Sequence, residues 1–183
     1  MSNILLEPFK WTPELKEYQA LLEKSASTDS KWPVFNGGKE HAAILMSIIF
    51  KYAKDYVYLY SYSLSPELSR LDIYYESLNE CINRGVKVKL LLQSSEAFDK
   101  DNPSIDIIRK NPSNIILLTE KQDKNLKKSL NEMDIHFAVS DNKRYRLEYN
   151  IKDRKAISSF NDPSVANTLK NAFESIFSDQ NLC

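Results

Sequence analysis

His136 is one of only two histidines in the chain, and it begins the segment HFAVSD. A histidine can attack phosphorus or transfer a proton if a second group orients its ring and cations neutralise the phosphoryl oxygens. The sequence that follows supplies groups of both kinds. With His136, Glu148 and Asn150 form the candidate catalytic set, in which Glu148 is the orienting carboxylate. The candidate phosphate-binding cations are Lys143, Arg146 and Lys152.

Each of these residues also has a purely structural interpretation. A histidine on a strand usually finds a hydrogen-bond partner in the core and has no further role. The cations can equally belong to a solvated hairpin, which is the better interpretation for Lys143. Between residues 143 and 155, however, six Lys and Arg residues stand against two acidic ones, so a phosphate-bearing ligand would be attracted there.

The turn-like segment DNKR, residues 141–144, predicts that the strands on its two sides pair as a hairpin. With residues 142–144 as a three-residue loop, all the apolar side chains lie on one face and the polar ones on the other. This register gives five pairs: Phe137 with Tyr149, Val139 with Leu147, His136 with Asn150, Ala138 with Glu148, and Ser140 with Arg146. It also predicts that Phe137, Val139, Leu147 and Tyr149 are buried.

Alternating helix and strand patterns run along most of the chain. Thr12-Pro13-Glu14 is a helix start with a capping hydroxyl, a proline and an acid, and residues 72–84 form a helix that ends at Gly85. Residues 39–54 form a helix that is apolar nearly all round and therefore buried. Strands are expected at 56–62, 86–92 and 115–118, and a last helix follows Asn161-Asp162-Pro163. Residues 25–38 are expected to form a loop, and residues 121–128 a solvated helix or loop.

This order predicts an α/β domain with a mixed, mostly parallel sheet flanked by helices. We expect an N-terminal helix and loop at residues 1–36, followed by the main domain at residues 37–183. Two further features have open interpretations. His41 follows Gly37-Gly38 at a helix start that could bind an anion, but a core position is favoured. Among the alternating tyrosines, Tyr56 and Tyr58 are expected in the core, while Tyr60 and Tyr62 could instead stack on bases.

Composition narrows the function classes. The formal net charge is zero, which argues against indiscriminate coating of nucleic acid or anionic membrane. No apolar run is long enough to cross a bilayer, and no signal peptide is recognisable, so we expect a cytoplasmic protein without membrane contact. The two histidines and two cysteines have no zinc spacing, and three glycines leave no P-loop or dinucleotide fingerprint. No metal or cofactor is therefore predicted.

The position of His136, the order of elements and the ending SFNDPSVANTLKNAFESIF resemble half of a phospholipase D-like domain across residues 37–177. In that family a histidine is followed by a lysine two residues later and by an acid seven residues later. The resemblance implies a phosphohistidine route without metal, in which two such sites meet in a homodimer and the second histidine protonates the leaving group. It also implies a nucleic-acid or protein partner, and it suggests a role in bacterial antiphage defence.

The sequence departs from the family pattern at two positions. Ala138 stands where the lysine is expected, and Lys143 stands where the acid is expected, while Asp141 comes two residues early. Losing one charged contact to a transition state typically costs about two to three decades in rate. We therefore favour a degenerate, non-catalytic or regulatory domain that binds a phosphate backbone or a partner. The alternative is a metal-independent phosphodiesterase or nuclease that uses His136 in a homodimer.

Overall fold

The computed structural model describes residues 6–99, 102–110 and 114–179. At its centre is a seven-stranded sheet with the order β1-β7-β6-β5-β2-β3-β4. The strands are β1 (Val34–Asn36), β2 (Tyr56–Ser61), β3 (Lys87–Leu92), β4 (Ile115–Leu117), β5 (His136–Ser140), β6 (Arg144–Asn150) and β7 (Lys155–Ser159). Strands β2, β3 and β4 are parallel, whereas β5, β6, β7 and β1 are joined by antiparallel pairing. The predicted α/β class with a mixed sheet is confirmed.

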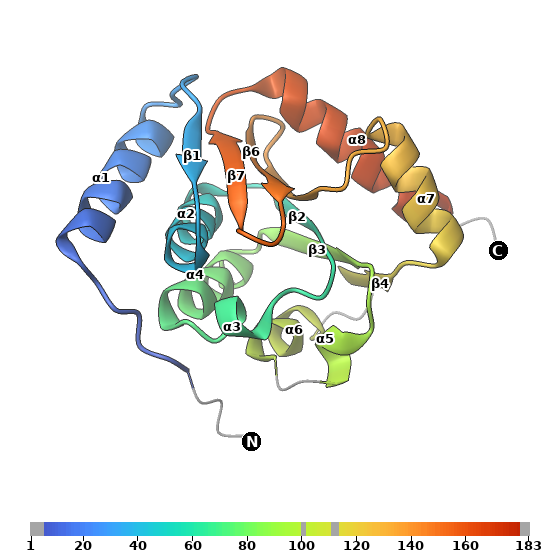
Figure 1. Cartoon of the computed structure of the whole chain (residues 1–183), viewed down its shortest axis with the longest axis horizontal. Helices are drawn as coiled ribbons and strands as arrows, with labels where there is room; N and C mark the ends of the chain where they lie inside the picture. The colour runs from blue at the N-terminus through green and yellow to red at the C-terminus, as the bar shows by residue number, and fades with distance from the viewer. Residues whose placement is uncertain (1–5, 100–101, 111–113, 180–183) are drawn as a thin grey trace.

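Helices cover both faces of this sheet (Figure 1). They are α1 (Pro13–Ser27), α2 (Lys39–Tyr52), α3 (Pro66–Ser69), α4 (Asp72–Asn83), α5 (Glu96–Asp99), α6 (Pro103–Ile108), α7 (Glu120–Ser129) and α8 (Pro163–Asp179). Helices α2 and α4 pack on one face, with α1 against α2, and α7 and α8 pack on the other. Within the described ranges, no helix is both long enough and apolar enough to cross a membrane.

Local signals in the sequence set several helix ends. The Thr12 hydroxyl accepts a hydrogen bond from the Leu15 amide, so α1 begins where the capping residue predicted. Helix α4 ends before Gly85, whose φ of +85° lies in the left-handed region that glycine adopts without strain. Helix α7 has a complete capping box between Thr119 and Gln122, and Leu126 is its buried residue.

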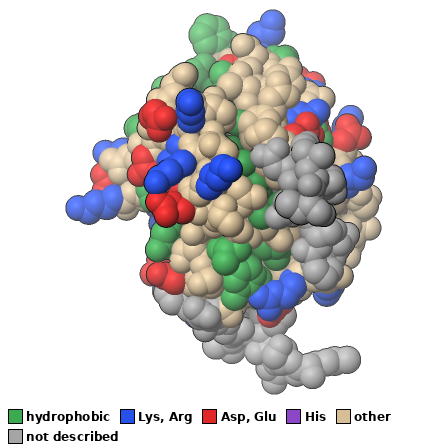
Figure 2. Space-filling model, turned by 90° about the vertical axis from the view of Figure 1, so that its right-hand side faces the viewer, with side chains coloured by type: hydrophobic (Ala, Val, Ile, Leu, Met, Phe, Trp, Pro, Cys, Tyr) green, Lys and Arg blue, Asp and Glu red, His purple; other side chains and the backbone are tan. Residues whose placement is uncertain are grey.

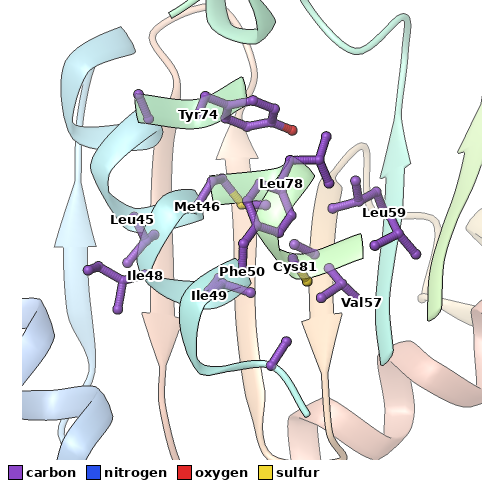
Figure 3. Packing of buried hydrophobic residues seen from close by; sticks show 14 of the residues in the cluster. Leu45, Met46, Ile48, Ile49, Phe50, Val57, Leu59, Tyr74, Leu78 and Cys81 are labelled. Atoms are coloured by element: carbon purple, nitrogen blue, oxygen red, sulfur yellow. The ribbon is translucent and has the colours of Figure 1, made fainter. Parts of the chain in front are cut away.

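The sheet separates two hydrophobic clusters. On one side, α2 and α4 cover Val57 and Leu59 of β2, and Figure 3 shows Phe50 and Leu78 between these helices and the strand. On the other side, Phe173 of α8 packs beneath Tyr58 in a stacked arrangement, with ring centroids 4.6 Å apart. The buried helix predicted at residues 39–54 is confirmed, because residues 42–50 of α2 are all buried.

The loop predicted at residues 25–38 was wrong in two places. Helix α1 continues to Ser27, and Val34–Asn36 forms the edge strand β1, which pairs antiparallel with β7. Local sequence gave no indication of this strand, because its three residues are held by partners more than a hundred positions later. The segment 1–36 thus contributes a strand to the main sheet. A domain boundary after residue 36 remains a prediction.

Candidate functional site

The hairpin of β5 and β6 carries the predicted site, with a register two residues away from the predicted one. Its five pairs are His136 with Glu148, Phe137 with Leu147, Ala138 with Arg146, Val139 with Tyr145, and Ser140 with Arg144. The predicted pairing of His136 with Asn150 was therefore wrong. The loop is residues 141–143, because Asp141 and Asn142 adopt the left-handed backbone that Asp and Asn tolerate (φ +53° and +57°). A shift of two residues keeps every side chain on its predicted face.

His136, Glu148 and Arg146 form one buried network at the end of the hairpin. Glu148 Oε2 lies 3.2 Å from His136 Nδ1, and Arg146 Nη2 donates to Glu148 Oε1 at 2.8 Å. The side chains are 10%, 9% and 9% exposed for His136, Glu148 and Arg146. All three are site residues predicted from the sequence, and the structure brings them together.

The second nitrogen of His136 is also engaged. The backbone amide of Tyr62, directly after β2, donates to His136 Nε2 at 3.1 Å. Because an amide N–H can only donate, Nε2 must be the unprotonated nitrogen, and the ring proton sits on Nδ1 facing Glu148. This hydrogen bond directs the Nε2 lone pair of His136 at the backbone that follows the neighbouring strand β2.

The charge on Glu148 is stabilised within this network. Burial alone raises the pKa of a carboxyl group, but the hydrogen bond from His136 and the charge and hydrogen bond of Arg146 outweigh that effect. The pKa of Glu148 therefore lies below its usual value, and the carboxylate is ionised at neutral pH.

The other predicted site residues lie in different places. Lys152 follows β6, lies near His136 and is exposed. Asn150 hydrogen-bonds to Asp153 in the turn after β6, at 3.1 Å. Lys143 lies in the turn at the far end of β5, about 13 Å along the strand from His136, and pairs with Asp29 at 2.7 Å. The structure therefore does not bring Lys143 to the site.

Two more residues are important although neither was predicted as a site residue. Asp141 accepts hydrogen bonds from the amides of Lys54, Asp55 and Tyr56 and pairs with Arg144 at 2.9 Å. It therefore fixes the hairpin turn to the start of β2. Arg154 donates to the Ser65 hydroxyl at 3.1 Å, beside the site. Its place near His136 depends on the turn between β6 and β7, which no local pattern revealed.

Two hollows meet at His136. One is a cavity of about 480 Å³ between the sheet and helices α2, α3 and α4. The other is a more open groove of about 1170 Å³, lined by residues of α7 and of the turn between β6 and β7. Tyr62, His136, Ile151 and Lys152 line both. Within the described residues, no group of three or more His, Cys, Asp or Glu side chains could hold a metal ion.

The tyrosines and His41 have different environments. Tyr56 and Tyr58 are buried as predicted, and Tyr60 is buried as well. Tyr62 is 47% exposed and Tyr149 is 52% exposed, so the prediction that Tyr149 is buried was wrong. Tyr149 lies at an irregularity in the pairing of β6 with β7, outside the hydrophobic cluster under α7 and α8. His41 is half-buried and packs edge-on against Tyr18, at 4.6 Å between ring centroids.

Comparisons with known proteins support the fold. No protein-family model and no curated protein matches the sequence. Among solved structures, NucT from Helicobacter pylori aligns with a TM-score of 0.59 at 15% identity, covering 80% of this chain and 96% of NucT. Nuc from Salmonella typhimurium, a phospholipase D family member, aligns with a TM-score of 0.56 at 13% identity, covering 80% of this chain and 95% of Nuc.

A third similar structure is TrmBL2, an archaeal chromatin protein with a novel mode of DNA binding. It aligns with a TM-score of 0.55 at 14% identity and covers 91% of this chain, which spans 61% of the length of TrmBL2. The chain therefore has a phospholipase D-like fold, and its β5–β6 hairpin presents His136 at the end of the sheet. At these identities the likeness establishes the fold, and function must be argued from the site.

Proposed function

We propose that this protein is a phospholipase D-like domain without phosphodiesterase activity, which binds single-stranded nucleic acid in the groove beside His136. The proposal that the protein lacks phosphodiesterase activity rests on the hydrogen bond from the Tyr62 amide to His136 Nε2. A nucleophile needs a free lone pair aimed at the substrate, whereas this one is directed at the backbone. Glu148 occupies the other ring nitrogen and also neutralises Arg146.

The departure from the family motif supports the same conclusion. Ala138 stands where a lysine is expected two residues after His136, and Lys143 stands where the acid is expected. The nearby acid Asp141 accepts hydrogen bonds from the amides at the start of β2 and pairs with Arg144, so it is engaged in the hairpin turn. On this alignment the chain lacks the lysine that would neutralise phosphoryl oxygens.

The groove has the composition of a single-strand binding surface. Tyr62 and Tyr149 expose about half of their surface there, and Lys152 and Lys155 lie beside them. Lys127 is already paired with Asp123 and Asp134, whereas no ion pair of Lys152 occurs among the described residues. Exposed aromatic rings stack on bases, and neighbouring lysines contact the phosphates. DNA binding by TrmBL2, which has a similar fold, is consistent with this proposal.

The surface charge favours such a local contact over a broad basic face. On the face in Figure 2, Lys and Arg side chains lie among Asp and Glu side chains. With a formal net charge of zero, the protein has little long-range attraction for duplex DNA. Stacking in the groove would therefore supply more of the affinity than electrostatic attraction does.

Fluorescence anisotropy with a labelled oligothymidylate tests the proposal. Each base that stacks on an aromatic ring contributes about 1–3 kcal/mol, so Tyr149→Ala should weaken binding about 5- to 150-fold. Lys152→Gln should weaken binding less and reduce its salt dependence. Trp32→Ala is the matched control, because Trp32 is 82% exposed but lies outside the groove. Equal binding by all three variants and the unchanged protein would exclude the groove as the binding site.

One observation favours the second candidate, a metal-independent phosphodiesterase or nuclease. A carboxylate on Nδ1, such as Glu148, is the arrangement that makes Nε2 of a histidine more basic. In the homodimer this mechanism needs, the second His136 would protonate the leaving group. EDTA-resistant cleavage of single-stranded DNA that disappears in His136→Ala would establish this candidate. A monomer by light scattering at micromolar concentration would exclude the two-histidine form of the mechanism.

A further inference from the structure

The cavity beneath His136 has an apolar interior. Between the sheet and helices α2 and α4, its inner wall is formed by six residues: Ala42, Met46, Leu59, Leu68, Tyr74 and Ala138. Figure 3 shows Met46 on α2, Tyr74 on α4 and Leu59 on β2, so three different elements contribute to this lining. A volume of about 480 Å³ lies within the range of pockets that hold small organic molecules. The interior would therefore accept an apolar group of moderate size.

Polar groups gather on the remaining wall. Arg146 lines the cavity, its side chain is only 9% exposed, and its Nε–H has no hydrogen-bond acceptor although it is buried. A buried donor without an acceptor is destabilising, and buried polar groups in native proteins are nearly always satisfied. A ligand with an acceptor oxygen in the cavity would supply the missing partner.

The charges around the cavity do not balance. Arg146, Lys152 and Arg154 line it together with two acids, Glu67 and Glu148. Glu148 pairs with Arg146, and Glu67 lies 3.6 Å from Arg154. The remaining positive charge is that of Lys152 at the mouth. A ligand with one negative charge would neutralise the pocket.

Ala138 explains why the space exists. It lies between Leu59 and Arg146 in the sheet and is 3% exposed, so its side chain faces the cavity that it lines. A lysine there, as the family pattern expects at this distance from His136, would extend into the same volume. The alanine therefore both removes a cation and opens the apolar part of the pocket.

We propose that this cavity binds a small amphipathic anion, a carboxylate or a phosphate monoester with a short apolar chain. The apolar chain lies against Met46, Leu59 and Tyr74, and the anionic group meets Arg146 and Lys152. The proposal does not depend on nucleic-acid binding, which involves the neighbouring groove, and its test contains no nucleic acid.

Calorimetric titration of the full chain with hexanoate, hexyl phosphate, hexanol and hexylamine tests the proposal. Saturable binding of either anion, at least tenfold tighter than that of hexanol and hexylamine, is expected. Ala138→Leu places three more carbon atoms in the apolar part of the cavity without changing a charge and should abolish binding. Lys152→Gln should weaken the binding of the anions and leave that of hexanol unchanged.

Two controls keep the result interpretable. Lys143→Gln removes a cation at the far end of the hairpin, where Lys143 pairs with Asp29, and should leave affinity unchanged. Circular dichroism shows whether each variant is folded, and Lys152→Gln, at an exposed position, gives a result even if the buried variant does not fold. Absence of saturable binding by both anions, or anion binding that persists in a folded Ala138→Leu protein, would overturn the proposal.

Discussion

Replacing Glu148 by glutamine keeps the shape of the side chain and removes its charge, which the buried network needs. Glu148 contacts Arg146 at 2.8 Å and His136 at 3.2 Å, and none of the three side chains is more than 10% exposed. Without the carboxylate, the Arg146 guanidinium remains buried with no opposing charge. Removing one partner of a buried ion pair typically costs about 3–5 kcal/mol.

This loss should be visible in unfolding experiments. For a chain of this size, 1 kcal/mol shifts the melting temperature by about 2–4 °C, so Glu148→Gln should melt about 6–20 °C lower. Urea unfolding at pH 7 measures the free energy directly. Arg146→Met should also be destabilised. The double variant should be more stable than the sum of the two losses predicts, by about 0.5–3 kcal/mol, because it leaves no unpaired charge.

The pH dependence provides a second readout. Because the folded-state pKa of Glu148 is lowered, its stabilising contribution is complete above the unfolded-state pKa of about 4.3. That contribution is lost as the pH falls through the lower, folded-state value. The stability difference between the unchanged protein and Glu148→Gln should therefore be constant near neutral pH and narrow below pH of about 4. Strict additivity in the double variant, or a difference that widens on acidification, would refute the network as described.

Two further predictions concern the hairpin. Asp141→Asn removes the charge of a carboxylate whose two oxygens together accept from three amides and pair with the 3% exposed Arg144, and it replaces one of those oxygens by an amide donor. Urea unfolding should show a loss of about 3 kcal/mol. A loss below about 0.5 kcal/mol, as at ordinary surface sites, would contradict this anchoring role. Ala138→Lys places a second cation beside Arg146 at a buried sheet position, so it should lower the melting temperature. It should give no EDTA-resistant phosphodiesterase activity. Activity that depends on His136 would show instead that only the lysine was missing.

Elements with strong local signals could be predicted from the sequence. The capping hydroxyl of Thr12 and the left-handed Gly85 gave helix ends within one or two residues, because caps depend on neighbouring backbone groups. Strand β1 could not be predicted, since residues 34–36 are held only by β7, far away in sequence. These three residues form a strand because they pair with the open edge of β7, and their own sequence contains no strand pattern.

In the candidate site, too, local patterns could be predicted from the sequence and contacts between distant segments could not. Alternation of apolar and polar residues fixed which face His136 and Glu148 share, because side chains in strands repeat every second residue. The register was wrong by two positions, since it depends on Asp141 and Asn142 adopting left-handed backbone in the turn. The prediction therefore placed Glu148 on the same face as His136 but opposite Ala138. The amide of Tyr62 could not be foreseen, because it reaches His136 from another strand.

Ala138 connects the two proposals through one physical cause. A lysine in a phosphodiesterase site neutralises phosphoryl oxygens, and its long side chain occupies the space next to the histidine. With alanine at position 138, the remaining buried cation is Arg146, which Glu148 already neutralises. On the proposed function, the site has too little free charge to stabilise a phosphoryl transition state, and the apolar cavity beside Ala138 is space that a lysine would enter. The same substitution that weakens the case for catalysis therefore strengthens the case for binding a small ligand.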